Sequence, residues 1–414
     1  MKRGADQSAQ VRTNPIFMTG KTAICLMAKG EIPDADKILR SLKLEDYAPI
    51  QNMNDPDIIL GNALVVEAKY RTMCYLIKNS GYQLCVDLPC GYTPKALHMS
   101  NAGLRFIGLD LPIVVKEIEP IILSIAKNPE QISFHGVDAT NYESIRLALE
   151  NVSGPLCITT EGMMMYFDEY EAEAVISNIR TILALHGGTW ITPDPEFMLQ
   201  FWGSFHSVFG KDSLNKLRTS RENAMQQSDV ANLSNPLIVN VQDVEGSTKK
   251  AETFVNRHGL KIEKINLAEH IPPLNIYSHL TPAQISNFKE AMRNCHYWAI
   301  TLDEDKRQHI ISTVPKTQPF KLNYALENGI LKVSISGRLD SLTAPRLLEA
   351  WEDTTSTAII ESAEFDCTGL EYISSAGARV LLILQKALNN NVTLINAKPS
   401  ITKTLKQKGC CFTE

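Results

Sequence analysis

The sequence predicts an α/β protein in which a doubly wound, Rossmann-like sheet is followed by a second, smaller α/β domain. Short apolar runs alternate with segments of helical periodicity along most of the chain. Acidic residues follow several of these runs, and a stretch with two prolines at 315–320 divides the chain. We therefore expect a tail at 1–13, a large domain over 14–314, a linker at 315–320 and a small domain over 321–414.

Composition narrows the class of protein. The 414 residues are 44% apolar and 21% charged, as in ordinary globular proteins, and the net charge of −5 disfavours nucleic acid as a partner. No apolar run approaches the ~20 residues that span a bilayer, so no membrane association is expected. The N-terminus lacks the apolar core of a signal peptide, which favours a cytoplasmic location. The nine cysteines have no zinc-ligand spacing, so no metal is expected.

The first strand–turn–helix–strand unit organises the large domain. Helices are expected near 19–39 and 57–79, before a buried strand at 84–88, a turn that contains Gly91, a helix at 95–101 and a strand at 105–109. Asp110 ends that second strand, 19 positions after Gly91. This arrangement suits a nucleotide-type cofactor, because the helix N-terminus can take its polar end while the carboxylate accepts two ribose hydroxyls.

Two more acidic residues end strands of the same domain. Further strands are expected at 132–137, 155–160, 189–192, 260–267 and 309–314, with helices at 112–126, 144–150, 169–185, 252–259 and 285–302. Asp138 and Glu161 follow the first two of these strands. Because ligands of open α/β sheets bind beyond the carboxyl ends of the strands, we expect Gly91, Asp110, Asp138 and Glu161 along one edge. Residues 194–247 are interpreted as an insertion over that edge.

The large domain resembles the leucine carboxyl methyltransferase family, a class I S-adenosylmethionine-dependent fold. The segment 155–167, PLCITTEGMMMYF, is similar to that family's strand and "EG(V/L)(L/M)MYL" signature. The Arg71-Thr72 pair, Asp110-Leu111-Pro112 followed by Lys116, and the pattern of Thr22-Ala23 and Ala28 also match in order. The resemblance implies a methyltransferase with S-adenosyl-L-methionine as cofactor and a methyl-acceptor substrate, either a small molecule or a protein carboxylate.

The resemblance also implies roles for single residues. Arg71 would pair with the methionine carboxylate, although a surface arginine with a buried stem is the structural alternative. Gly91 would let the backbone approach the cofactor, and Asp110 would hold the ribose hydroxyls. Asp138 and Ala139 would lie at the adenine. Glu161 would lie near the methionine amino group or the reacting centre.

The sequence departs from the family at two places. Pro89, Thr93, Pro94 and Lys95 stand in the turn where the family has GxG followed by Asp-Thr-Arg. Lys29 stands at the arginine of the family's "RA" pair, so the charge stays but the guanidinium fork is lost. An inactive relative is therefore the alternative to an enzyme.

The acceptor decides whether a base is needed. A carboxylate acceptor is already ionised at pH 7 and requires none, so catalysis would rest on proximity and orientation. An alcohol or phenol would require a base, and His206, Glu161 or Tyr166 could serve. Glu161 and Tyr166 are our candidate catalytic residues.

The small domain is expected to begin with a hairpin, 321–327 and 330–336, around Asn328-Gly329. Helices at 341–353, 378–388 and 401–408 and strands at 358–366 and 391–395 follow. Residues 366–377, DCTGLEYISSAG, resemble the strand–loop–helix segment of STAS domains, the anti-sigma-factor antagonist fold. The family's phosphorylated serine is Ala376 here, so Ser375 and then Ser374 are the candidates for phosphorylation; the alternative is that either serine only caps the helix.

Two functions follow from these residues. The leading hypothesis is an S-adenosylmethionine-dependent O-methyltransferase that acts on a carboxylate and is regulated or docked through the STAS domain, which would bind a protein partner. The alternative is a non-catalytic signalling adaptor whose degenerate methyltransferase domain is a scaffold or cofactor sensor. A nicotinamide-dependent oxidoreductase is disfavoured because GxGxxG is absent.

Overall fold

A computed structural model describes residues 16–47, 55–212, 215, 235–312, 318–410 and 412. The chain divides into two compact units, and the boundary lies between Val314 and Pro315. The tail expected at 1–13 and residues 315–317 of the expected linker lie outside the described residues. Among those that are described, no helix combines the length and the apolar content needed to cross a membrane.

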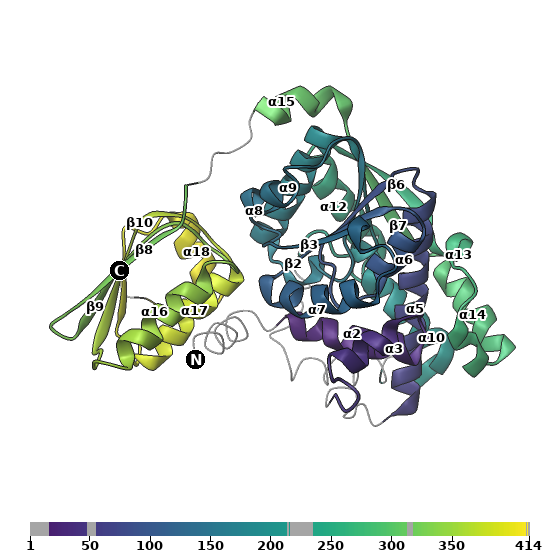
Figure 1. Cartoon of the computed structure of the whole chain (residues 1–414), viewed down its shortest axis with the longest axis horizontal. Helices are drawn as coiled ribbons and strands as arrows, with labels where there is room; N and C mark the ends of the chain where they lie inside the picture. The colour runs from purple at the N-terminus through teal and green to yellow at the C-terminus, as the bar shows by residue number, and fades with distance from the viewer. Residues whose placement is uncertain are drawn as a thin grey trace. The chain divides into compact units, whose positions relative to one another are not determined.

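The N-terminal unit contains a seven-stranded, doubly wound sheet of Rossmann-like type, which confirms the predicted α/β fold class (Figure 1). Its order is β3-β2-β1-β4-β5-β7-β6, and the first five strands in chain order are parallel while β7 runs antiparallel to both neighbours. The strands are β1 (Leu84–Asp87), β2 (Arg105–Asp110), β3 (Ile132–Gly136), β4 (Leu156–Thr159), β5 (Gly188–Thr192), β6 (Leu260–Asn266) and β7 (His296–Leu302).

Helices cover both faces of this sheet, because successive strand side chains point to opposite sides. Cys85 and Phe106 enter one apolar core, whereas Val86 and Ile107 enter the other. The first core is completed by α2 (Phe17–Lys29), α3 (Ala35–Ser41), α5 (Pro56–Asn79), α6 (Lys95–Asn101), α7 (Pro112–Ile125) and α14 (Pro282–Met292). The second is completed by α8 (Tyr142–Ala148), α9 (Glu169–His186) and α12 (Val244–Asn256) (Figure 1). The helix α10 (Phe197–Phe209) packs on α5 and α14.

Two predicted elements of this unit are wrong. The helix expected at 285–302 is α14 followed by β7, which lies between β5 and β6; the adjacent Tyr297 and Trp298 enter the first and second cores, so the apolar run begins without strand alternation. The described part of the strand expected at 309–314 belongs to a short helix, α15 (Arg307–Ser312), whose Ile310 packs into the second core, and residues 313 and 314 lie outside the described residues. Of the insertion expected at 194–247, the described part begins with a short 3-10 helix (Asp194–Glu196) followed by α10, and α12 starts at Val244, before the expected insertion ends.

One glycine of the central sheet should tolerate no side chain. Gly188 begins β5 at φ +111°, and a Cβ there would lie 1.9 Å from the carbonyl oxygen of Leu156 on β4. We expect Gly188→Ala to destabilise the N-terminal unit by more than about 4 kcal/mol in urea unfolding, since backbone would have to move. Gly103→Ala is the control: φ is +83° and nothing lies within 4 Å, so about 1–2 kcal/mol is expected. Equal losses in the two variants would contradict this account.

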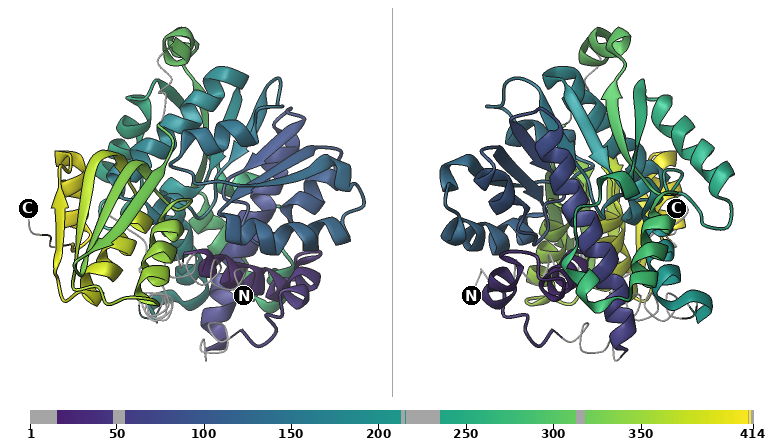
Figure 2. Two further views of the ribbon diagram at one scale, coloured as in Figure 1. Left: turned by 60° about the vertical axis from the view of Figure 1, so that its left-hand side comes forward. Right: turned by 90° about the vertical axis from the view of Figure 1, so that its right-hand side faces the viewer.

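The C-terminal unit is a four-stranded sheet of order β11-β10-β9-β8, with β8 antiparallel to β9 and the other pairs parallel. Its strands are β8 (Lys321–Glu327), β9 (Ile330–Leu339), β10 (Ser362–Ile373) and β11 (Val392–Ile395), and α16 (Ala344–Thr355), α17 (Ser375–Ala387) and α18 (Pro399–Gln407) pack on one face (Figure 2). The predicted hairpin is confirmed: Asn328 and Gly329 both have positive φ between paired β8 and β9.

Candidate functional site

The candidate site lies at the carboxyl edge of the large sheet. Asp87 and Asp110 are the last residues of β1 and β2, while Asp138 and Glu161 each follow the last residue of β3 or β4 by two positions. The strands β3, β2, β1 and β4 are consecutive neighbours in the sheet and parallel, so these four acidic residues share one edge.

Asp87 forms a buried ion pair with the helix that follows the glycine turn. Its Oδ1 accepts hydrogen bonds from Lys95 Nζ at 2.8 Å and Thr159 Oγ1 at 2.6 Å, and Asp87 and Lys95 are only 0% and 2% exposed. Burial alone would lower the pKa of Lys95, but the attraction of Asp87 and Glu161 together with the hydrogen bond to Asp87 raises it overall, so the ammonium is retained. The other oxygen, Oδ2, is buried and has no hydrogen-bond partner among the residues that the structure describes. It is an acceptor that a ligand could satisfy.

Glu161 faces the same ammonium and a second one. Its Oε2 lies 3.7 Å from Lys95 Nζ and its Oε1 lies 3.9 Å from Lys69 Nζ, both longer than direct hydrogen bonds. Lys69 comes from α5, is itself buried, and lies over the Phe201 ring of α10. Asp87, Lys95, Glu161 and Lys69 thus form a cluster of two carboxylates and two ammoniums, called the charge quartet below.

The glycine turn brings Gly91 next to the acid of β2. The amide of Gly91 donates to Asp110 Oδ2 at 2.8 Å, and the amide of Leu111 donates to Oδ1 at 2.7 Å. A Cβ added at Gly91 would meet nothing closer than the methyl carbon of Thr93, at 3.9 Å, so there is space above the turn. Burial raises the pKa of Asp110 to about 7 despite the two backbone hydrogen bonds.

The raised pKa of Asp110 makes stability depend on pH. In the unfolded chain an aspartate titrates near 3.9, so the folded unit binds the proton more tightly. Asp110 therefore favours the folded state at low pH, and this contribution is lost as pH rises through about 7. We expect Asp110→Asn to lose less stability than the wild type between about pH 5 and pH 8 in urea titrations. An unchanged pH slope would contradict the assignment.

The adenine-side candidates lie in the loop after β3. Asp138 is buried, and its Oδ1 accepts hydrogen bonds from the amide and hydroxyl of Thr140 at 2.8 and 2.6 Å. Ala139 is also buried, and its carbonyl accepts a bond from Asn178 of α9. Both residues lie on the predicted edge. Their role at an adenine stays a prediction.

The first half of α2 also lies at this edge. Tyr166 OH donates to Thr19 Oγ1 at 3.1 Å, which joins the loop after β4 to α2. Lys21 pairs with Glu117 of α7 at 2.9 Å, and Glu117 accepts a bond from Tyr92 in the glycine turn at 2.6 Å. Burial raises the pKa of Tyr166, so this phenol stays protonated near neutral pH. The α2 helix therefore closes part of the edge.

Three sequence candidates point elsewhere. Arg71 Nε pairs with Glu67 one turn earlier on α5, at 2.6 Å, and the ion pairs to Glu161 come from Lys69 and Lys95 instead. Lys29 is the exposed last residue of α2. His206 is exposed on α10 and stacks on Trp202. The cofactor role of Arg71 and Lys29 remains a prediction.

The edge fits the cofactor that the sequence implies. The methionyl end of S-adenosylmethionine carries an ammonium and a carboxylate. The charge quartet offers two carboxylates for the ammonium and two ammoniums for the carboxylate. The partnerless Oδ2 of Asp87 is an acceptor for an ammonium, and the space above Gly91 admits a ligand next to the backbone. Asp110 uses two of its roughly four lone-pair positions on backbone amides, so acceptor capacity remains for ribose hydroxyls.

Comparison with known proteins identifies the smaller unit. Residues 321–413 match the family profile described as STAS domain. The C-terminal unit is a STAS domain. In it, Ser374 caps α17: its Oγ accepts the amide of Gly377 at 3.3 Å, and the residue is buried. Ser375 is the first residue of α17 and is partly exposed, while Ala376 is buried. Phosphorylation of either serine remains a prediction.

The larger unit is similar to solved methyltransferase structures at low identity. A Nostoc punctiforme protein assigned to the O-methyltransferases is 11% identical over 59% of this chain and 59% of its own length, with a TM-score of 0.33. An O-methyltransferase family protein from Burkholderia thailandensis is 13% identical over 67% and 71%, with a TM-score of 0.32. Human N-acetylserotonin methyltransferase, solved with S-adenosylmethionine, is 13% identical over 64% and 61%, with a TM-score of 0.30.

These similarities transfer no substrate or partner, because identity and TM-score are both low. The chain spans only 59% of the Nostoc protein and 61% of the human enzyme. The comparison with curated protein sequences gave no match.

Sequence reasoning missed three members of the charge quartet as site residues: Asp87, Lys95 and Lys69. A signal existed for the first, because an aspartate inside a buried strand needs a partner. Lys95 was visible as a departure from the family's turn, but its reach back to β1 depends on how α6 packs.

Proposed function

We propose that the N-terminal unit is an S-adenosylmethionine-dependent O-methyltransferase of the leucine carboxyl methyltransferase type, acting on a carboxylate and docked or regulated through the STAS domain. The charge quartet carries this proposal. The buried Asp87, the partly buried Glu161 and two buried ammoniums at the carboxyl edge complement the zwitterionic methionyl end of that cofactor, and Oδ2 of Asp87 has no hydrogen-bond partner among the described residues.

Different residues of the chain would bind different parts of the cofactor. Asp87 and Glu161 would take the methionyl ammonium, while Lys95 and Lys69 would take the carboxylate. The backbone at Gly91 would approach the cofactor next to this methionyl end. Asp110 would hold the ribose hydroxyls, with Asp138 and Ala139 at the adenine. In this arrangement Lys95 and Lys69 replace Arg71 as the cations that meet the carboxylate.

The chemistry follows from position and solvent exclusion. The bound cofactor supplies an electrophilic methyl group on a sulfonium. A carboxylate acceptor needs no proton removed, so the side chains have to orient it and keep water away. Thr19 and Tyr166 link α2 to the loop after β4 and would close the edge over the reactants. Glu161 holds the methionyl end in place beside them.

The identity of the acceptor group can be tested by the lability of the product. The full-length protein is incubated with methyl-tritiated S-adenosylmethionine and a size-fractionated extract of small molecules and proteins. Methyl esters release volatile methanol in alkali, whereas methyl ethers and methylamines do not. We expect volatile label after alkali with the wild type and none with Asp110→Ala. Label that stays bound in alkali would contradict a carboxylate acceptor.

A second candidate function is a STAS-based signalling adaptor without catalysis. It is favoured by the turn itself, where Tyr92 is 1% exposed and bonded to Glu117, and by the two backbone amides that already occupy Asp110. In that case a protein partner would bind the surface of the STAS domain at Ser375, and the carboxyl edge of the large sheet would bind no cofactor. Titration with S-adenosylhomocysteine and S-adenosylmethionine separates the two, since the adaptor predicts binding of neither.

A further inference from the structure

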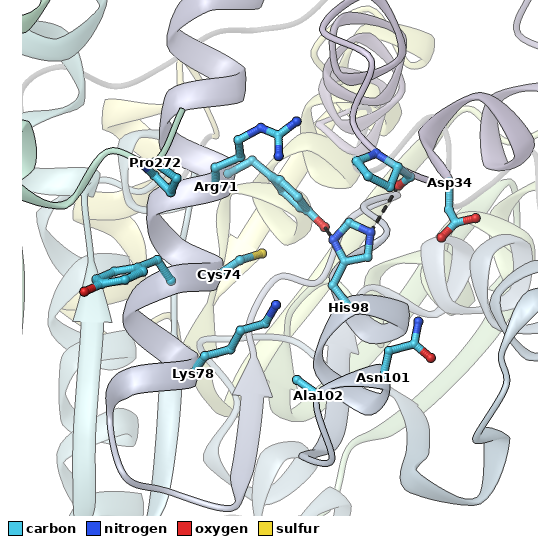
Figure 3. A pocket seen from close by; sticks show the side chains of 11 residues that line it. Asp34, Arg71, Cys74, Lys78, His98, Asn101, Ala102 and Pro272 are labelled. Atoms are coloured by element: carbon cyan, nitrogen blue, oxygen red, sulfur yellow. Dashed lines mark hydrogen bonds between the residues drawn. The ribbon is translucent and has the colours of Figure 1, made fainter. Parts of the chain in front are cut away.

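We propose that a cavity of the N-terminal unit away from the charge quartet binds a small organic monoanion with an apolar body. The cavity lies between α5 and α6, has a volume of about 530 Å³, is open to the surface, and is lined also by Pro33 and Pro272 (Figure 3). This volume lies within the range of small-molecule sites in proteins. None of the charge quartet lines it, so the inference is independent of the proposed methyltransferase function.

The walls of the cavity are largely apolar. They are formed by the side chains of Tyr70, Cys74, Tyr75, Ala102 and the two prolines. Tyr70 and Cys74 are buried, and burial raises the pKa of the Cys74 thiol to about 11, so no thiolate forms there at neutral pH. A ligand that fills this space must therefore carry an aromatic or aliphatic body.

Arg71 is positioned toward the cavity by a buried acid. Its Nε donates to Glu67 Oε1, and the carboxylate of Glu67 is held in turn by the backbone amides of Asn275 and Ile276, each at 2.9 Å. These bonds fix the orientation of the guanidinium; Figure 3 shows Arg71 extending from α5 at the wall of the cavity. Its two terminal nitrogens make no other hydrogen bond to the described residues, so they can meet a carboxylate in the cavity.

His98 contributes no charge. Tyr70 OH lies 2.7 Å from Nδ1 and the carbonyl oxygen of Pro33 lies 3.2 Å from Nε2, which requires the tautomer with hydrogen on Nε2. Burial lowers the pKa of His98, so the ring is neutral at pH 7. Asp34, the acid at the rim, is paired with Lys37 at 2.7 Å.

The remaining charge at the cavity is a single positive one. Glu67 compensates Arg71 and Lys37 compensates Asp34, whereas Lys78 forms no ion pair within the described residues. Lys78 extends from α5 into the space below Cys74 and His98 (Figure 3). One uncompensated cation beside an apolar wall fits a monocarboxylate and disfavours cations and multiply charged anions.

The test titrates the full-length protein calorimetrically with sodium benzoate, with benzamide as the uncharged isostere and with inorganic phosphate as an anion without an apolar body. We expect saturable 1:1 binding of benzoate, at least tenfold weaker binding of benzamide, and no saturable heat with phosphate. Benzamide or phosphate binding as tightly as benzoate would overturn the stated ligand class, and an absence of benzoate binding would overturn the site.

Two variants locate the binding. Lys78 is exposed, so Lys78→Gln should leave the fold intact while benzoate affinity falls at least tenfold. The exposed Lys116 on α7 provides the matched control, and Lys116→Gln should bind as the wild type does. Ala102→Phe should abolish binding by filling the cavity from its exposed rim. Unchanged benzoate affinity in either Lys78→Gln or Ala102→Phe would place the ligand elsewhere and refute the proposal.

Discussion

Replacing Lys95 with methionine is expected to destabilise the N-terminal unit by about 3–5 kcal/mol, the loss that follows when one partner of a buried ion pair is removed. Asp87 would keep its charge with no exposure to water and would retain only the hydroxyl of Thr159 as a donor. Urea unfolding, followed by the fluorescence of Trp190 and Trp298 in the sheet, measures the loss.

The double variant Asp87→Asn with Lys95→Met separates the pair from the packing of the lysine stem. The double variant also removes the negative charge of Asp87, which the single variant leaves buried and unpaired with a cation. We therefore expect it to recover most of the lost stability. Lys116→Met on exposed α7 should change stability by less than about 0.5 kcal/mol. If Lys95→Met were as stable as the wild type, the buried pair would not be the anchor of this edge.

Replacing Glu161 with glutamine is expected to weaken binding of S-adenosylhomocysteine at least tenfold, which corresponds to about 1.4 kcal/mol. The substitution keeps the shape of the side chain and removes the negative charge offered to the methionyl ammonium. It leaves Lys95 paired with Asp87 and removes the negative charge beside Lys69, so both cations remain present for the ligand's carboxylate. Calorimetric titration of the folded variant gives the dissociation constant.

Arg71→Gln is the informative companion to this variant. The family resemblance assigns the methionine carboxylate to Arg71, whereas the structure pairs that guanidinium with Glu67 beside the other cavity. We expect Arg71→Gln to bind S-adenosylhomocysteine as the wild type does. A tenfold loss in Arg71→Gln together with no loss in Glu161→Gln would restore the family assignment and remove the charge quartet from the cofactor site.

Most of the fold could be predicted from local sequence. The strands at Leu84–Asp87 and Leu156–Thr159 are short apolar runs that end in polar residues, and the turn at Asn328-Gly329 specifies its hairpin. His296–Leu302 could not be recognised, because the adjacent Tyr297 and Trp298 are both fully buried, which obscures the alternation, and because the strand follows a helix after only a few residues. Its pairing with distant strands decides its conformation.

The candidate site was predictable only in outline. Strand-end acids such as Asp110 and Glu161 could be placed at one edge because parallel strands share their direction. Which cation meets them could not be read from the sequence. Arg71 and Lys69 are two positions apart on α5, so they point in different directions, and only the packing of α5 shows that Lys69 faces Glu161.

A crystal structure of the full-length protein with S-adenosylhomocysteine tests the central claim most directly. We predict the ligand at the carboxyl edge, with its amino group within hydrogen-bond distance of Asp87 Oδ2 or Glu161 and its carboxylate at Lys95 or Lys69. An edge that holds no ligand at saturating concentration, or a ligand carboxylate bound to Arg71, would contradict the account.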